Sequence, residues 1–518
     1  MFTLYYHLSK VPFIKKYYLL LLGLLFYFFS IGKYATSFGV WLAPIFLLAH
    51  LNTLPKKKSL LIISFIIILL FPIQWYSYIP APMPLYLIIC LGNALFFLIP
   101  YLLHIGLYNK AKHYTLLVFP LSIVLVEFLL ASFSPYASWG AMVYAKPYAL
   151  VYNQLTSITG IYGVSFMIGL TASLLAWIKH QNFQQAVVVP PLLILLTAHG
   201  AVWIYGTVRL KAKTTAKQVT YVVGITVPLS SESIIFSDID YTQVGAPLKD
   251  TLNVFKDVYL LNKSVPTQQQ EEVDKWFENM HQKLLAQTVI AADRGAEIIV
   301  WSEGNGLALK HQEAMFIEQC QKLAVEKDIV LLATLNTKTL GQTRSENKVV
   351  AIDPKGQVVF THLKSYPVPG AENSVKGDGL LKTITTTYGK ISTVICFDAD
   401  FPRLVRQAKH LESDLLFVPS FDWEAIDPYH TYMARIRAIE NGIPLFRQAN
   451  NGLSAAYDEK GRVVATHRYV NEAQGYIFLV PLAIHSTFTL YSQLGDFFPY
   501  LCILSLLFIV IIRYRKKG

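Results

Sequence analysis

The first 208 residues contain seven apolar segments, each long enough to cross a lipid bilayer. A membrane-spanning helix needs about 20 predominantly apolar residues, and a soluble helix of that length would need a polar face toward water. An eighth segment, near residues 497–513, follows a long polar stretch. We therefore predict a polytopic α-helical membrane domain of about eight spans, the first seven near residues 14–31, 35–52, 59–78, 84–106, 114–132, 160–178 and 186–206.

Composition changes sharply at about residue 210. Over all 518 residues, 53% are hydrophobic and 15% are charged, whereas soluble domains use about 25% charged residues. The apolar excess lies before the boundary, and the stretch after it has the mix of a soluble domain. We predict three parts: a transmembrane domain at 1–208, an extramembrane domain at 209–484, and a final span with a basic tail at 485–518.

Basic residues predict the orientation, because cytoplasmic loops of membrane proteins are enriched in Lys and Arg. They follow the even-numbered spans and precede the first, whereas the loops after spans three and five contain almost none. Both termini are therefore expected in the cytoplasm and the 209–484 domain on the other side. The net charge of +12 follows from the same loops, and no partner nucleic acid is expected. The residues concerned are Lys10, Lys15, Lys16, Lys56, Lys57, Lys58, Lys110, Lys112, Lys179, Arg513, Arg515, Lys516 and Lys517.

Between residues 209 and 484, short apolar strands alternate with helices and hairpins, which is typical of a layered α/β sandwich. Turn sequences at 353–356 and 458–461 each predict a hairpin, and a polar insertion near 230–270 is expected to be a loop. Strands are expected near 219–227, 298–301, 329–335, 348–352, 358–362, 390–396, 415–419 and 445–449, and helices near 268–294, 312–327, 403–410 and 428–441.

Three chemically complementary residues stand at or just after predicted strands: Glu303, Lys364 and Cys396. A carboxylate can take the proton of a thiol, a lysine can stabilise a developing oxyanion, and a thiolate is a strong nucleophile. Taken singly, a strand cysteine is more often a packing residue, and a loop Glu or Lys is usually solvated. Their joint pattern favours a covalent catalytic set. The histidines lack metal-ligand spacing, so no metal or other cofactor is expected.

These residues resemble the Glu–Lys–Cys triad of the nitrilase, or carbon–nitrogen hydrolase, superfamily. A domain of this kind after a polytopic membrane region, and before one last span, resembles the apolipoprotein N-acyltransferase family. The resemblance extends to the stretches 396–402, 433–442, 447–452 and 489–496. It implies a nitrilase-like αββα sandwich, catalytic Glu303, Lys364 and Cys396, and a supporting carboxylate, Glu372.

The resemblance also implies a function. A phospholipid would give its acyl chain to Cys396 as a thioester, and the α-amino group of the diacylglyceryl-cysteine of an apolipoprotein would accept it. The protein would be a monomer in the bacterial inner membrane, with its catalytic domain in the periplasm. Two alternatives remain: a membrane-tethered amidase or nitrilase acting on a small periplasmic amide, and a catalytically silent scaffold that binds lipoproteins.

Five other residues near this set could have structural roles rather than roles in catalysis or in membrane contact. Asp398 and Asp400 precede a predicted helix and could cap it, although the family more often has Tyr-Glu where this chain has Phe397 and Asp398. Phe421, Trp423 and Tyr429 could form an aromatic rim that dips toward the bilayer. Ordinary core packing of these three rings is an equal alternative.

Overall fold

The chain forms two compact units. The computed structural model describes residues 12–52, 56–109, 112–145, 150–181, 185–213, 218–227, 270–339, 342–469 and 476–515. One unit comprises Met1–Ala212 together with Thr489–Gly518, and the other is Lys213–Phe488. The predicted insertion near 230–270 lies almost entirely outside the described residues.

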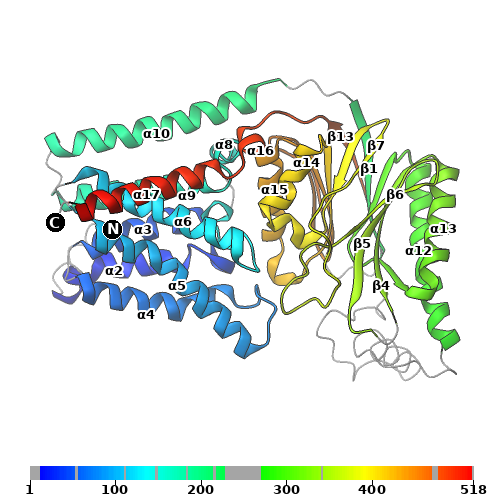
Figure 1. The fold of residues 1–518 in the computed structure, drawn as a ribbon, viewed down its shortest axis with the longest axis horizontal. Helices are drawn as coiled ribbons and strands as arrows, with labels where there is room; N and C mark the ends of the chain where they lie inside the picture. Colours follow the sequence, from blue (N-terminus) through cyan, green and yellow to red (C-terminus); the bar gives the residue numbers. More distant parts are fainter. Residues whose placement is uncertain are drawn as a thin grey trace, which may run out of the picture. The chain divides into compact units, whose positions relative to one another are not determined.

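The first unit is helical, and each predicted apolar segment contains a helix (Figure 1). Among the described residues, five helices, in α4, α5, α6 with the turn before it, α9 and α10, are long and apolar enough to cross a membrane; the apolar parts of α2, α3 and α17 are shorter. The number of spans therefore stays a prediction. The long helices are α2 (Pro12–Phe28), α3 (Ser37–Leu51), α4 (Lys56–Trp75), α5 (Met83–Leu107), α6 (Val118–Phe133), α9 (Tyr162–His180), α10 (Gln185–Lys211) and α17 (Phe497–Arg515), and the short ones are α7 (Leu150–Asn153), α8 (Thr156–Thr159) and α16 (Leu490–Leu494).

Helices α6 and α9 lie in the interior of this unit, whereas α4, α5 and α10 lie at its surface. The apolar windows of α6 and α9 are 72% and 78% buried, and those of the other three only 22–33%. The exposed side chains of the surface helices include Leu61, Phe65 and Ile88. A continuous surface of large apolar side chains suits hydrocarbon rather than water, so this unit is that of a membrane protein.

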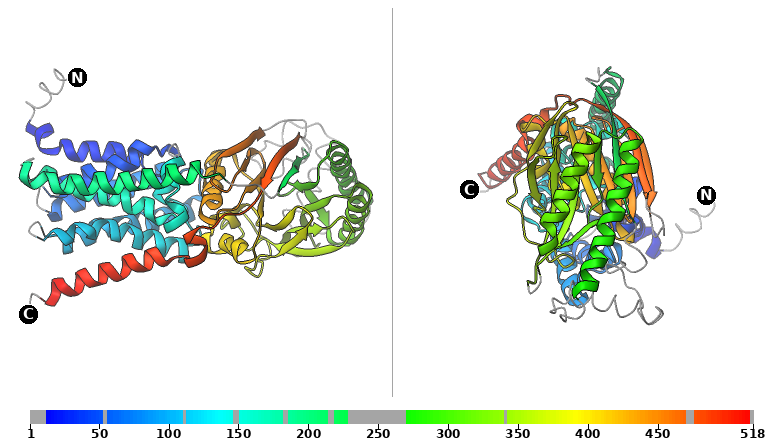
Figure 2. Two further views of the ribbon diagram at one scale, coloured as in Figure 1. Left: turned by 90° about the horizontal axis from the view of Figure 1, so that it is seen from above. Right: turned by 90° about the vertical axis from the view of Figure 1, so that its right-hand side faces the viewer.

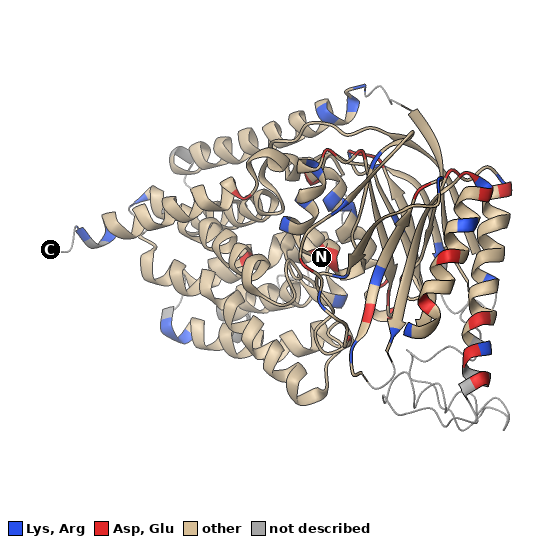
Figure 3. Ribbon diagram, turned by 45° about the vertical axis from the view of Figure 1, so that its right-hand side comes forward, with Lys and Arg blue, Asp and Glu red and all other residues tan. Residues whose placement is uncertain are grey.

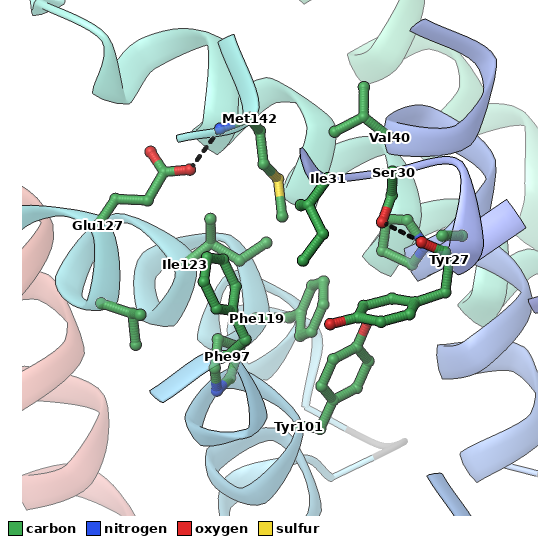
Figure 4. Close-up of a pocket in the computed structure, with 14 residues that line it drawn as sticks. Tyr27, Ser30, Ile31, Val40, Phe97, Tyr101, Phe119, Ile123, Glu127 and Met142 are labelled. Carbon is green, nitrogen blue, oxygen red and sulfur yellow. Dashed lines mark hydrogen bonds between the residues drawn. The ribbon is translucent and has the colours of Figure 1, made fainter. Parts of the chain in front are cut away.

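A mostly apolar pocket lies between α2, α3, α5 and α6 (Figure 4). Its lining includes the rings of Tyr27 and Tyr101, which lie close together, and the carboxylate of Glu127. Oε1 of Glu127 accepts a hydrogen bond of 2.9 Å from the backbone N–H of Met142. An ionisable residue within a lipid-facing bundle is costly, and this one is buried in the bundle.

The second unit contains two β-sheets (Figure 1). The first has the order β13-β1-β2-β4-β5-β6, with β3 beside β4, and the second has the order β12-β11-β10-β9-β8-β7. The first sheet comprises β1 (Gln218–Thr226), β2 (Ile298–Trp301), β3 (Gly306–Leu309), β4 (Val330–Lys338), β5 (Ser345–Ile352), β6 (Val358–Leu363) and β13 (Tyr476–Ile484). The second comprises β7 (Thr383–Thr386), β8 (Gly389–Thr393), β9 (Leu415–Phe421), β10 (Leu445–Asn450), β11 (Gly452–Tyr457) and β12 (Val463–Tyr469).

Strand side chains alternate between two apolar cores, as the two-residue period of a strand requires. In β1, Val222 faces the core between the sheets and Val223 the core under helices α12 (Gln270–Asp293) and α13 (Lys310–Lys327). A third core joins the second sheet to α14 (Pro402–His410) and α15 (Tyr429–Asn441). Figure 2 shows α12 and α13 side by side on their sheet. The layers therefore run helix, sheet, sheet, helix, which confirms the predicted αββα sandwich.

Charged residues are distributed differently in the two units (Figure 3). In the sandwich they follow the outer faces of α12 and α13, where Lys275 pairs with Glu271 and Lys322 with Glu318. In the helical unit they lie mostly near helix ends. The sandwich helices therefore present a surface suited to water, and the membrane helices do not.

Both predicted hairpins are confirmed, but three strands, β3, β7 and β13, are absent from the prediction. At the two hairpin turns, the Asp353 and Asp458 side chains accept hydrogen bonds from backbone N–H groups two and four residues on. Strand β13 contains Pro481, which argues against a strand in the middle of a sheet. At the edge, where β13 pairs only with β1, a proline is tolerated.

Candidate active site

The structure brings Glu303, Lys364 and Cys396 together from two different sheets. Glu303 follows β2 by two residues and Lys364 follows β6 directly, both in the first sheet, whereas Cys396 follows β8 in the second. The exposed fractions of the three residues are 5%, 0% and 2%. The site is therefore formed where the sheets meet, and it is shielded from water.

Cys396 lies on a sharp turn rather than at the end of a strand, so the predicted strand at 390–396 is too long. Strand β8 ends at Thr393, and Cys396 begins a short 3₁₀-helix, Cys396–Asp400. Oδ2 of Asp398 accepts a 3.1 Å hydrogen bond from the backbone N–H of Ile395, which draws the chain out of the sheet. The φ angle of Cys396 is 48°, uncommon for a residue with a side chain and typical of functional sites.

Glu303 is held by three donors. Its Oε1 accepts hydrogen bonds from Nζ of Lys364 at 2.8 Å and from Nδ2 of Asn347 at 2.7 Å. Its Oε2 accepts one at 2.9 Å from the backbone N–H of Phe421. The carbonyl of the same Phe421 lies 3.5 Å from Sγ of Cys396. The last residue of β9 therefore links the carboxylate to the thiol.

Lys364 is also paired with Glu372, the predicted supporting carboxylate. Burial alone would lower the pKa of Lys364, but the charges of Glu303, Glu372 and Cys396 raise it well above its ordinary value. Burial raises the pKa of Glu372, and Glu303 raises it further, although Lys364 opposes both. Lys364 is therefore a permanent cation between two carboxyl groups.

The thiol of Cys396 is protonated at neutral pH. Burial and the charge of Glu303 raise its pKa to about 11, although Lys364 and His430 act in the opposite direction. At pH 7 almost all of the thiol is therefore in its protonated form. A reaction at this sulfur therefore needs a base that removes the proton as attack proceeds.

Asp398 does not cap the helix that follows it. The N-cap residue of α14 is Phe401, and no side chain accepts a capping hydrogen bond there. Asp398 instead accepts backbone hydrogen bonds from Ser365 at 3.2 Å and Tyr366 at 2.8 Å, besides the one from Ile395. It therefore ties the segment after Lys364 to the turn that carries Cys396.

Asp400 does not cap that helix either, because it belongs to a second buried charged cluster. Nε2 of His430 lies 3.1 Å from Oδ2 of Asp400, and Nδ1 lies 2.9 Å from Oδ1 of Asp422. Arg447 donates from both terminal nitrogens to Asp422, at 2.8 Å each. Asp422, His430 and Arg447 were not predicted to belong to a site, although charged residues in otherwise apolar segments were a usable signal.

Donor atoms of Cys396, Asp422 and His430 lie within 4.8 Å of one another, a spacing that could suit a metal ion. Arg447, however, already occupies both oxygens of Asp422. The two carboxylates also raise the pKa of His430 well above its usual value, against the effects of burial and of Arg447, and a protonated imidazole has no lone pair for a metal. These residues fit a network of paired charges better than a metal site.

The three aromatic residues of the predicted rim are neither buried nor fully exposed. Phe421, Trp423 and Tyr429 all have intermediate accessibility. Phe421 also ends β9, where its backbone contacts both Glu303 and Cys396. A role at the bilayer surface stays a prediction.

Comparison with solved structures gives nitrilase-superfamily proteins. Nit3 of Saccharomyces cerevisiae, described as a member of branch 10 of that superfamily, is 16% identical, with a TM-score of 0.38 over 52% of this chain and 93% of Nit3. An amidase from Nesterenkonia sp. is 18% identical, with a TM-score of 0.34 over 40% of this chain and 85% of the amidase.

Comparison with sequence families and curated proteins covers both units. The family described as the apolipoprotein N-acyltransferase N-terminal domain matches residues 22–174, and the carbon-nitrogen hydrolase family matches residues 264–474. Apolipoprotein N-acyltransferase of Rickettsia prowazekii is 26% identical over 437 residues, 79% of this chain and 78% of the relative. The Geobacter metallireducens enzyme is 24% identical over 439 residues, 78% of this chain and 75% of the relative. The chain therefore belongs to the apolipoprotein N-acyltransferase family and contains a carbon-nitrogen hydrolase domain.

Proposed function

We propose that this acyltransferase moves an acyl chain from a phospholipid to the N-terminal diacylglyceryl-cysteine of an apolipoprotein, through a thioester on Cys396. The observation that carries the proposal is the buried Glu303–Lys364 ion pair beside a buried thiol. This site lies in a chain that also contains apolar, membrane-capable helices. Family membership supports a lipoprotein as the substrate.

In the first half-reaction, Sγ of Cys396 attacks the ester carbonyl of the phospholipid. Glu303 takes the thiol proton as the carbon–sulfur bond forms, which compensates for a thiol pKa of about 11. The tetrahedral intermediate carries a negative oxygen, and the permanent cation of Lys364 stabilises it. When the ester C–O bond breaks, the proton passes from Glu303 to the departing alkoxide, and a lysophospholipid leaves.

In the second half-reaction, the α-amino group of the lipoprotein attacks the thioester. Glu303 accepts a proton from the nitrogen, the C–S bond breaks, and Glu303 passes that proton to the departing sulfur, which leaves an amide and the thiol of Cys396. The thioester is more reactive than the ester from which it forms, but the overall exchange of an ester for an amide ends in the more stable acyl linkage, so the transfer needs no nucleotide. Because the three residues are almost inaccessible to solvent, the thioester is protected from water until the amine arrives.

Glu372 has a supporting role in this scheme. It pairs with Lys364 on the atom that also contacts Glu303. Two carboxyl groups hold one ammonium group, so the ammonium stays fixed when Glu303 is protonated during the reaction. Preorganised charge of this kind costs little rearrangement at the moment of reaction.

A phospholipid with a labelled acyl chain tests this function against the alternative, a membrane-tethered amidase. The purified full-length protein is given the lipid with and without a synthetic diacylglyceryl-cysteine peptide. We expect labelled amide on the peptide only when it is present, with little free fatty acid in either case. Rapid release of free fatty acid without peptide, or hydrolysis of small amides with no acyl transfer, would contradict the proposal.

The same proposal places the sandwich on the periplasmic side of the inner membrane, where the lipid-modified end of a lipoprotein lies. In a Cys396→Ala background, an impermeant thiol reagent is applied to intact spheroplasts carrying Glu318→Cys, at an exposed position on α13. Lys58→Cys, exposed at the start of α4, is the matched control for the cytoplasmic side. We expect Glu318→Cys to react at once and Lys58→Cys only after lysis. The reverse pattern would rule out this orientation.

A further inference from the structure

A second cation lies close to the thiol of Cys396, and the scheme above does not use it. A ring nitrogen of His430 lies within 4.8 Å of both Sγ of Cys396 and a carboxylate oxygen of Asp422. The ring belongs to α15, which covers the second sheet, whereas Lys364 reaches the site from the first sheet. His430 is 2% exposed, so its interaction with the thiol is poorly screened by water.

The surroundings of His430 favour its charged form. Asp400, in the turn that begins with Cys396, lies 3.1 Å from one ring nitrogen, and Asp422, directly after β9, lies 2.9 Å from the other. Both carboxylates are at most 1% exposed. Arg447 on β10 pairs with Asp422 through two hydrogen bonds, so His430 and Arg447 together balance the two carboxylates. A buried acid needs such pairing to remain charged.

His281 shows what a buried histidine in this domain looks like without such partners. Its ring stacks on Phe316 with the centroids 3.7 Å apart, and Nε2 lies 2.7 Å from the carbonyl oxygen of Leu307. Burial lowers the pKa of His281 to about 4, although that hydrogen bond acts in the opposite direction. Burial alone therefore gives a neutral imidazole here, and the two carboxylates make the difference at His430.

We propose that His430 is a positioning residue that carries a fixed positive charge beside Cys396 and stabilises its thiolate. His430 lies on the helix that covers the second sheet, whereas Lys364 belongs to the first sheet. Asp400 and Asp422 hold the ring, and Asp400 ties its position to the cysteine turn itself. The proposal rests on the proposed function only in taking Cys396 as the nucleophile.

The direction of the effect follows from the charged groups around the sulfur. Glu303 disfavours the thiolate, whereas Lys364 and His430 favour it, and Arg447 is a further cation that interacts with Cys396. Around the imidazole itself, burial lowers the pKa of His430, and so does Arg447, whose Nη2 lies 2.9 Å from Nδ1 of the ring. Asp400 and Asp422 act in the opposite direction and raise the pKa well above its ordinary value. Removing the charge of His430 must therefore raise the pKa of the thiol and lower its reactivity at a given pH.

The test is the pH dependence of alkylation of Cys396 by iodoacetamide, measured by mass spectrometry on the cysteine-containing peptide of the full-length protein in detergent. For His430→Gln we expect the midpoint of the profile to rise by about one pH unit, and the rate at pH 8 to fall about tenfold, as for loss of an opposite charge within a few ångströms. An unchanged profile in a folded His430→Gln protein would overturn the proposal.

Two further variants keep the test decisive. Asp400→Asn leaves the ring in place but weakens its hold on the proton, so the profile should shift in the same direction by a smaller amount. If His430→Gln does not fold, an unchanged profile in Asp400→Asn overturns the proposal. His281→Gln is the matched control, expected to lower thermal stability without moving the profile. Alkylation uses no lipid, so a shifted profile in a protein without acyl transfer would contradict only the proposed function.

Discussion

Two charged clusters meet at Cys396, one from each sheet, and they differ in the balance between carboxyl groups and cations. In the cluster of the first sheet, two carboxyl groups share the single cation of Lys364, so one carboxyl group can exchange a proton. In the cluster of the second sheet, two carboxylates are matched by the two cations His430 and Arg447. The first arrangement suits proton transfer, and the second suits a fixed electric field.

The comparison predicts that substitutions in the first cluster change the chemistry, whereas those in the second change only the reactivity of the sulfur. The largest effect is expected at the sulfur itself. Cys396→Ala should abolish both acyl-enzyme and product, and Cys396→Ser should leave at most a trace, because a hydroxyl is far less ionised. Cys320→Ala, at a buried thiol on α13, is the matched control and should keep full activity. Normal product from the Ala variant, in the labelled-phospholipid assay, would remove Cys396 from the mechanism.

Glu303→Gln should lower the rate of acylation at pH 7 by about 10²–10⁴, the usual contribution of a general base. The loss should shrink at high pH. Without the base, attack depends on the thiolate already present, which rises tenfold per pH unit below the thiol pKa. Loss of the Glu303 charge lowers that pKa, whereas burial still raises it. We therefore expect a steep increase in rate from pH 7 to 9 in the variant.

The wild-type protein, whose base works throughout that range, should change far less. Glu313→Gln breaks a carboxylate–lysine pair on α13 and should keep the wild-type profile. A flat profile for Glu303→Gln would argue against its role as the base.

Lys364→Ala should lower acylation by about 10²–10³, the cost of losing one stabilising group at an oxyanion. Raising the pH should not restore activity, because the missing positive charge does not depend on how the thiolate forms. The contrast with Glu303→Gln separates the two roles. Lys348→Ala removes another buried lysine of the same sheet, paired with Glu313 and Glu346, and should lower stability but not the rate per folded molecule. Equal pH responses in the Glu303 and Lys364 variants would show that the division of roles is wrong.

The smallest expected effect is at Asp398, which joins the two clusters without contributing to either. Asp398→Asn weakens the three backbone hydrogen bonds that hold Ile395, Ser365 and Tyr366. We expect the free energy of unfolding to fall by about 1.5–3 kcal/mol, as for loss of a hydrogen bond to a charged group. Thermal unfolding in detergent measures it. A loss of activity with unchanged stability would instead place Asp398 in the chemistry.

The layers of the sandwich and the residues of the first cluster were accessible from the sequence for a physical reason. Successive residues of a strand, such as Val222 and Val223, face opposite sides of the sheet, so the pattern of apolar residues indicates which faces are buried. Glu303 and Lys364 stand within two residues of the ends of such strands, so the chain itself indicates that they lie where the strands end. The motifs around them resemble those of the nitrilase superfamily, and this resemblance indicated their catalytic roles.

The second cluster was not accessible in this way, because its members depend on partners far away in the chain. His430 lies on a helix and Arg447 inside a strand, and neither position reveals that both contact Asp422. Capping of the following helix was one open interpretation of Asp398, because a carboxylate before a helix favours capping. The backbone turn at Cys396 brought other N–H groups closer to it. Local pattern predicts burial, whereas the pairing of buried charges is set by tertiary contacts.

The central claim is that Cys396 carries the acyl chain. The most direct measurement is mass spectrometry of the proteolysed wild-type protein after incubation with phospholipid and no acceptor. We expect the peptide containing Cys396 to gain the mass of one acyl chain, and hydroxylamine or the diacylglyceryl-cysteine peptide to remove it. An acyl chain on any other residue, or formation of amide product with no adduct on Cys396, would contradict the account.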